Sequence, residues 1–159
     1  MSHFTKLDKA NVVDAEAFIA AAAELGLTVV ERNVEMRAWD TDDAPVHVDI
    51  CCRFPGKKGD GAAKYGIGLI KNGKQYEMVS DWALTGFYLP KNIQAKLPTG
   101  FPQKDGPGGG AYAACEAFRG LTLQLTSKHT LIANYRRQGF VARAVEDANK
   151  NIQLTLTRG

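Results

Sequence analysis

The segment from Tyr65 to Trp82, YGIGLIKNGKQYEMVSDW, constrains the fold more than any other part of the chain. Its two halves, YGIGLI and QYEMVSDW, are rich in β-branched and aromatic residues, which favour strands. Between them, KNGK contains Asn72-Gly73, the dipeptide that a two-residue type I′ turn prefers because both central positions need a positive φ. The segment therefore predicts an antiparallel hairpin, and with it a sheet.

Two helices are predicted, one on each side of this hairpin. We expect Asn11 to be the N-cap of the first, because Asp14 three residues later completes a capping box. This helix ends at Gly26, in the position that favours a C-terminal glycine. The second helix is expected over about residues 121–138, with Gly139 as its stop. Apolar residues recur at helical spacing in both segments.

Strands flank each helix, which is typical of an α+β protein. LTVVERNVEM and VHVDICCRF follow the first helix, FVARAVED and IQLTLTR follow the second, and HFTKL and YEMVSDW precede them. Residues 1–54 and 75–159 therefore predict two βαββ units that form a mostly antiparallel sheet with two helices packed on it. EAFIAAAAELGLTV aligns without gaps to HTLIANYRRQGFVA, and this alignment fits either an internal duplication or the coincidence of a helix with a shared glycine.

The second unit carries a long insertion rich in glycine and proline, over about residues 84–120. Its central part, LPKNIQAKLPTGFPQKDGPGGG, contains four prolines. We expect the insertion to be flexible, or to gain order when a partner binds. On this interpretation residues 1–159 form a single domain.

Composition and cysteine usage favour a cytoplasmic protein. The start, MSHFTKLDKA, has no basic region followed by an apolar run, and no stretch approaches the ~20 apolar residues that span a bilayer. Cys51, Cys52 and Cys115 form no CxxC pair, and neighbouring strand residues point to opposite faces of a sheet. These cysteines are typical of buried small side chains in a reducing compartment. We expect no contact with a membrane.

Charge is unevenly distributed along the chain. Residues 1–52 contain four Lys or Arg against ten Asp or Glu, whereas residues 53–104 contain nine against three. Lysines interleaved with aromatic residues are typical of phosphate contacts beside base stacking. A solvated lysine surface that protects strand edges is the simpler interpretation, because bidentate phosphate recognition favours arginine. Lys71 and Lys74, beside the turn, are the candidates for contact with an anionic partner.

The sequence contains no catalytic or metal-binding motif. His3, His47 and His129 have neither HxH nor HExxH spacing, and GPGGG lacks the GxxxxGK[ST] pattern of a phosphate-binding loop. We therefore expect no metal and no cofactor. Enzymatic activity is left open and is not favoured.

Asp81-Trp82 stands where the regular sheet stops and the insertion begins, and it is the leading candidate site. Because adjacent strand residues face opposite sides, a buried Trp82 predicts an exposed Asp81 that caps the next turn. An exposed Trp82 predicts instead a rigid anchor for a partner. A catalytic acid at Asp81 is the third alternative.

Three segments, MSHFT, YEMVSDW and YRRQGFVARAVEDANKNIQLTLTR, resemble a family of small proteins of unknown function, a conserved reading frame of cyanobacteria and algal plastids. The turn WDTDDAP and the region from Leu84 to Gly120 depart from that family. The resemblance implies no agreed activity or catalytic residues. It does imply an accessory role beside a MoxR-type AAA+ ATPase, and a shared surface at the matching positions His3, Phe4, Tyr76, Asp81, Trp82 and Gly139.

Two hypotheses about function follow. The first is a non-enzymatic accessory module that docks a protein partner, such as that ATPase, or forms an oligomer with itself. The alternative is a protein that binds nucleic acid or nucleotides through its basic middle segment. The candidate binding residues are Asp81, Trp82, Tyr76, His3, Lys71, Lys74 and His129.

Overall fold

The predicted hairpin lies in the middle of the sheet. The computed structural model describes residues 5–12, 14–36, 45–56, 65–97, 110–149 and 151–158. β4 (Gly66–Asn72) and β5 (Gln75–Ser80) pair antiparallel, so the two-residue turn is Gly73-Lys74 and not the predicted Asn72-Gly73. Of the two turn residues only Gly73 has a positive φ, of 65°. This is the pattern of a type II′ turn, which needs glycine at its first central position.

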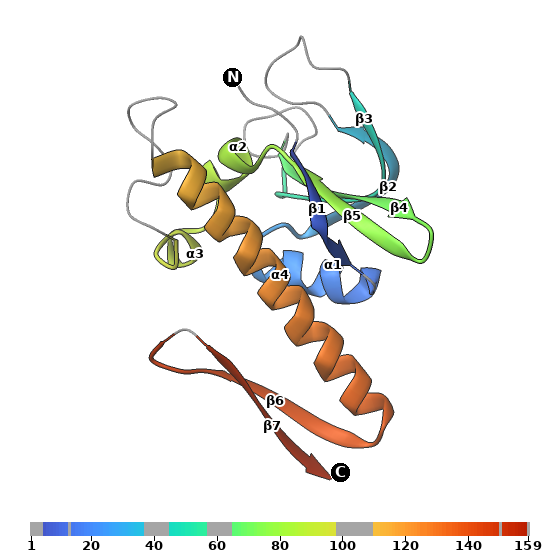
Figure 1. Ribbon diagram of the computed structural model, residues 1–159, viewed down its shortest axis with the longest axis vertical. Coiled ribbons are helices and arrows are strands. Elements are labelled where there is room, and N and C mark those ends of the chain that lie inside the picture. The colour runs from blue at the N-terminus through green and yellow to red at the C-terminus, as the bar shows by residue number, and fades with distance from the viewer. Residues whose placement is uncertain are drawn as a thin grey trace.

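The main sheet has five strands in the order β1-β5-β4-β3-β2, and every neighbouring pair is antiparallel (Figure 1). The other three strands are β1 (Thr5–Val12), β2 (Val29–Met36) and β3 (Val46–Arg53). β1 pairs with β5 and is irregular between Lys6 and Asn11. The predicted α+β class with a mostly antiparallel sheet is confirmed.

The first helix, α1 (Ala15–Glu24), begins three residues later than the capping box predicted. Asp14 is the N-cap, and its side chain accepts a hydrogen bond of 3.1 Å from the Ala17 N–H. The predicted cap, Asn11, lies in β1, because the strand continues to Val12. The buried face of α1 consists of Ala17, Phe18, Ala21 and Ala22, which turns the small alanine stripe toward the sheet.

The second long helix, α4 (Gly110–Arg137), has 28 residues and begins well before the predicted start near residue 121. Two short helices, α2 (Trp82–Phe87) and α3 (Lys91–Gln94), precede it. The expected insertion over residues 84–120 is therefore largely helical, apart from residues 98–109, which lie outside the described part of the chain. Glycine-rich composition near residue 110 suggested a loop, but α4 begins at Gly110.

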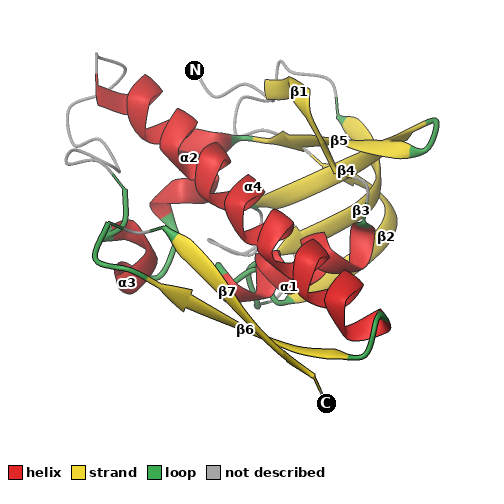
Figure 2. Ribbon diagram, turned by 60° about the horizontal axis from the view of Figure 1, so that its bottom comes forward, coloured by secondary structure: helices red, strands yellow, loops and turns green. Residues whose placement is uncertain are grey.

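The C-terminal hairpin, β6 (Phe140–Glu146) and β7 (Ile152–Arg158), forms a separate two-stranded sheet. The second βαββ unit therefore has the predicted element order, but its last two strands do not join the main sheet as expected. Figure 2 shows α4 between the main sheet and this hairpin, and α1 beside α4. Gly26 and Gly139, which align in the proposed repeat, both have a φ of 89°.

The main core lies between the sheet, α1 and α4. Its largest fully buried side chains come from all three, and they include Phe18, Leu25, Ile67, Met78 and Phe118. Cys52 belongs to this core, whereas Cys51 packs on the other side of β3 with Val48 and Val79, as neighbouring strand residues should. None of the helices that the structure describes is long and apolar enough to span a membrane.

Candidate functional site

Asp81 and Trp82, the leading candidates from the sequence, are both buried, each with 3% of its surface exposed. The expectation that a buried Trp82 leaves Asp81 exposed was wrong. β5 ends at Ser80, and α2 begins directly at Trp82, so strand alternation no longer applies to this pair. The Trp82 ring packs edge-on against Phe118 of α4, with ring centroids 5.1 Å apart. Trp82 is therefore not an exposed anchor.

Hydrogen bonds fix the backbone around this junction. The Ser80 hydroxyl donates to the Gly66 carbonyl at 2.7 Å, and it lies 3.0 Å from the Thr85 hydroxyl. The Thr85 N–H donates to the Asp81 carbonyl at 2.9 Å, which closes the first turn of α2. Ser80 and Thr85 are both fully buried, so these bonds satisfy polar groups that water does not reach.

Tyr65 and Cys115, two side chains near Asp81, each have a raised pKa and stay neutral around pH 7. Burial and, to a smaller extent, the neighbouring Tyr88 and Asp81 together raise the pKa of the Tyr65 phenol to about 12. Burial, then the Asp81 and Glu116 carboxylates, raises the pKa of the Cys115 thiol. The Tyr65 and Tyr88 rings stack at 5.3 Å. Because the nucleophilic form of cysteine is the thiolate, Cys115 has the environment of a structural thiol and not of an activated one.

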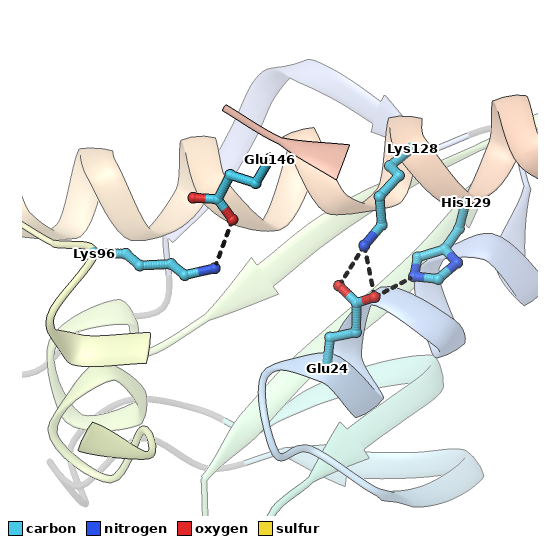
Figure 3. A network of polar contacts seen from close by, with 5 residues as sticks. All are labelled: Glu24, Lys96, Lys128, His129 and Glu146. Carbon is cyan, nitrogen blue, oxygen red and sulfur yellow. Dashed lines mark hydrogen bonds and ion pairs between the residues drawn. The ribbon is translucent and has the colours of Figure 1, made fainter. Parts of the chain in front are cut away.

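His129, another candidate, lies in a polar contact between α1 and α4 (Figure 3). Its Nε2 atom is 3.1 Å from Glu24 Oε1. Lys128 donates to both carboxylate oxygens of Glu24, at 2.6 and 2.8 Å. His129 and Lys128 therefore attach the C-terminal end of α1 to the C-terminal half of α4, which explains the position of His129.

A second ion pair joins the short helices to the C-terminal hairpin. Lys96 Nζ, just after α3, is 3.0 Å from Glu146 Oε2 at the end of β6 (Figure 3). The pair stands at a pocket of about 140 Å³ whose wall is formed by α4 and the hairpin. The other lining residues are Ala117, Leu121, Gln124, Leu125 and Ile152. The pocket is small and half apolar, so it suits one side chain better than a cofactor.

The remaining candidates lie elsewhere. Lys71 and Lys74 flank the tip of the β4–β5 hairpin, and the Lys71 N–H donates to Asp49 Oδ2 at 2.6 Å. Tyr76 is half-buried in β5, and His3 lies outside the described residues. A strand of the length of β5 separates the lysine tip from Asp81 by roughly 20 Å. The structure thus does not bring the predicted binding residues together.

The basic middle segment is also dispersed. Arg53 Nε bonds Glu31 Oε1 at 2.7 Å, and its guanidinium also donates to the carbonyls of Phe54 and Gly56. Lys96 is paired with Glu146. Two of the segment's cations therefore have structural partners, and the lysines at the hairpin tip are separated from them. Lys57, Lys58, Lys64 and Lys104 lie outside the described residues.

Among the described residues, the two large apolar side chains with the greatest exposure lie on the C-terminal hairpin, where the sequence predicted no site. Val141 and Val145 are 48% and 56% exposed. They point away from α4, because Ala142 between them is buried and because Phe140 packs on Tyr135 with ring centroids 6.1 Å apart. The cross-strand register places further residues on the same outward face. We call this surface the hairpin face: Val141, Arg143, Val145, Gln153, Thr155 and Thr157.

The signal for the hairpin face was present in FVARAVE, where apolar residues occupy both sides of an alternating strand: Val141 and Val145 lie on one side, and Phe140, Ala142 and Ala144 on the other. It went unused because the strand was expected to join the main sheet, where a second apolar side would be covered. Comparisons of the chain with protein-family models, curated proteins and solved structures gave no match, so the family resemblance stays a prediction.

Proposed function

We propose that this protein is a non-enzymatic, cytoplasmic accessory module that docks a protein partner through the hairpin face. The observation that carries the proposal is the exposure of Val141 and Val145 on a two-stranded sheet outside the main core. Exposed apolar side chains rimmed by polar residues are typical of an interaction site, and the two valines lie on either side of Arg143 on one face of the hairpin. The free cysteines Cys51, Cys52 and Cys115 are in keeping with a reducing compartment.

The chemistry of the hairpin face defines the partner that it fits. Arg143 lies between Val141 and Val145, and the facing positions on β7 are Thr157, Thr155 and Gln153. Interfaces favour an arginine within an apolar patch, because its planar guanidinium pairs with a carboxylate while its stem packs. The partner should therefore present an apolar surface that contains an Asp or Glu. The family resemblance makes a MoxR-type AAA+ ATPase the first candidate.

The test measures binding of the full chain to the purified MoxR-type ATPase of the same host. We expect Val145→Lys and Arg143→Ala each to weaken binding at least about tenfold, or roughly 1.4 kcal/mol. Val30→Lys is the matched control, because Val30 is also an exposed strand valine but lies on β2 of the main sheet. Absence of binding to the ATPase would contradict its role as partner. Equal losses for Val145→Lys and Val30→Lys would contradict the hairpin face.

The competing hypothesis, nucleic-acid or nucleotide binding through the basic middle segment, makes a different prediction. Binding to a single-stranded oligonucleotide would weaken steeply with salt, and Lys71→Gln with Lys74→Gln would reduce the slope. Val145→Lys would leave that binding unchanged or strengthen it. The two hypotheses are therefore distinguished by measuring Val145→Lys, Lys71→Gln and Lys74→Gln in both assays, binding to the ATPase and binding to the oligonucleotide.

A further inference from the structure

The outer edge of β7 is open in the part of the chain that the structure describes. β7 pairs with β6 along its whole length, in seven consecutive residue pairs without a bulge, and with no other described strand. α4 packs against β6 and contacts β7 less. Figure 1 shows the hairpin below α4, with β7 leading to the C-terminus. β7 is thus a full-length strand with one unpaired side.

The hydrogen-bonding groups on that side belong to the even-numbered residues. At the turn the Asp147 N–H donates to the Asn151 carbonyl at 2.9 Å, which makes these two residues a hydrogen-bonded pair. Hydrogen-bonded and non-hydrogen-bonded pairs alternate in antiparallel ladders. Residues 153, 155 and 157 therefore bond to β6, whereas the N–H and C=O groups of Leu154 and Leu156 point to the open edge.

β7 also lacks the devices that normally keep an open edge from pairing. Proteins protect such edges with lysine, proline, bulges or very short strands. From Ile152 to Thr157 the strand contains no charged residue and no proline, and its register is regular. The inward side of the strand is partly uncovered as well, since Leu156 is 37% exposed.

We propose that β7 pairs antiparallel with β7 of a second copy, about a twofold axis at Thr155, so that two hairpins form one four-stranded sheet. This register pairs all seven residues of the strand. Leu154 faces Leu156 of the other copy on the side toward α4, and Gln153 faces Thr157 on the outward side. The two Thr155 residues face each other, and cross-strand Thr pairs are favourable.

A second copy fits this edge because the strand is self-complementary in sequence and in charge. Leu154 meets Leu156 in the two pairs beside the axis, and the partly exposed Leu156 becomes covered. Arg158, the only charged residue of β7, lies opposite Ile152, so the two arginines are roughly 20 Å apart at opposite ends of the ribbon. A twofold interface of this kind closes on itself and gives a dimer and not a fibre. The inference rests on the proposed function only in treating the hairpin as an interaction element.

The first test depends on which residues of the two β7 strands face each other in the proposed register. At the twofold axis the two Thr155 residues form a non-hydrogen-bonded pair with Cα atoms about 4.5 Å apart, which is within disulfide range. We expect Thr155→Cys to give a disulfide-linked dimer on mild oxidation. Thr157→Cys is the matched control on the same strand and face: its two copies would be roughly 14 Å apart and should not cross-link. Wild-type protein measures the background from Cys51, Cys52 and Cys115.

Sedimentation equilibrium, which measures the dimer dissociation constant, is the second test. Wild-type protein should be dimeric, and Leu156→Pro should raise the dimer dissociation constant at least about tenfold. This proline removes an N–H that points to the open edge and not to β6, so the hairpin keeps its own ladder. A monomeric wild type, or Thr157→Cys cross-linking as readily as Thr155→Cys, would overturn the proposal. Neither result would contradict the docking proposal, because that proposal is tested by binding to the ATPase.

Discussion

Trp82 and Phe118 meet edge to face, with ring centroids 5.1 Å apart and ring planes at 74°. This contact joins the end of β5 to α4 in the main core, and both side chains are almost fully buried. We expect Trp82→Ala to lower the free energy of unfolding by about 3–5 kcal/mol, since it leaves a large cavity. Urea denaturation of the variant and the wild type measures the difference.

The pair should also be energetically coupled. In a double-mutant cycle with Phe118→Ala, the double variant should lose about 0.5–1.5 kcal/mol less than the sum of the two single losses, because each single variant already removes the edge-to-face contact. Val141→Ala is the control, because exposed side chains change stability by no more than about 0.5 kcal/mol. A Trp82→Ala variant as stable as Val141→Ala would show that the junction is not part of the core.

The junction between β5 and α2 separates the features that local sequence patterns could predict from those that they could not. Strand alternation and the Asn-Gly turn predicted β4 and β5, and the helix periodicity predicted α1, because those signals are local. The burial of both Asp81 and Trp82 was not predictable in this way. It depends on α2 beginning at Trp82, so that Asp81 is the single residue between β5 and α2, and on Phe118 of α4 packing against Trp82.

The arrangement of the second βαββ unit was missed for a similar reason. The strands β6 and β7 were predicted from their own alternation, but alternation does not say which sheet a hairpin joins. The long reach of α4, which starts at Gly110, places its last turn away from the main sheet. β6 then packs on α4, as the Tyr135–Phe140 contact shows, and the hairpin face is left uncovered.

The contact of Lys128 with Glu24 should add measurable stability. Lys128 donates to both oxygens of Glu24, and only 14% of its side chain is exposed. We expect Glu24→Gln to lower the free energy of unfolding by about 1 kcal/mol at low salt, and by less at high salt. Arg32→Gln is the control, because the Arg32–Glu16 pair is 3.6 Å apart and mostly exposed. Equal effects of the two substitutions would contradict a special role for Lys128.

Two glycines should respond in opposite directions to alanine. A Cβ at Gly66 would overlap the Cys52 carbonyl of the neighbouring strand, which is backbone and cannot move aside cheaply. We expect Gly66→Ala to lower the free energy of unfolding by more than about 1 kcal/mol. Gly120 lies within α4 with open space around it, so Gly120→Ala should raise stability by about 0.5–1 kcal/mol through helix propensity. Thermal denaturation of both variants checks the signs, and a stabilised Gly66→Ala would contradict the close approach of β3 and β4.

Stability should fall as the solution becomes alkaline, because two buried groups hold their protons in the folded state. Burial, with the neighbouring Cys51, raises the pKa of Cys52 from 9.0 to about 12, and burial raises the pKa of Tyr65 from 10.0 to about 12. Between the unfolded-state and folded-state pKa values, Cys52 and Tyr65 lose their protons in the unfolded chain but keep them in the folded chain. Ionisation of these two groups therefore favours unfolding. The contribution is intact below pH 9 and is lost as the pH rises toward 12.

Urea denaturation at a series of pH values from below 9 to near 12 tests this sign. Wild-type stability should decrease with pH, and the decrease should be shallower in Cys52→Ala, which removes the thiol, and in Tyr65→Phe, which keeps the ring stacked on Tyr88. Other titrating groups, such as the lysines, are common to all three proteins and cancel in the comparison. Identical slopes in the three proteins would mean that neither group keeps its proton in the folded state.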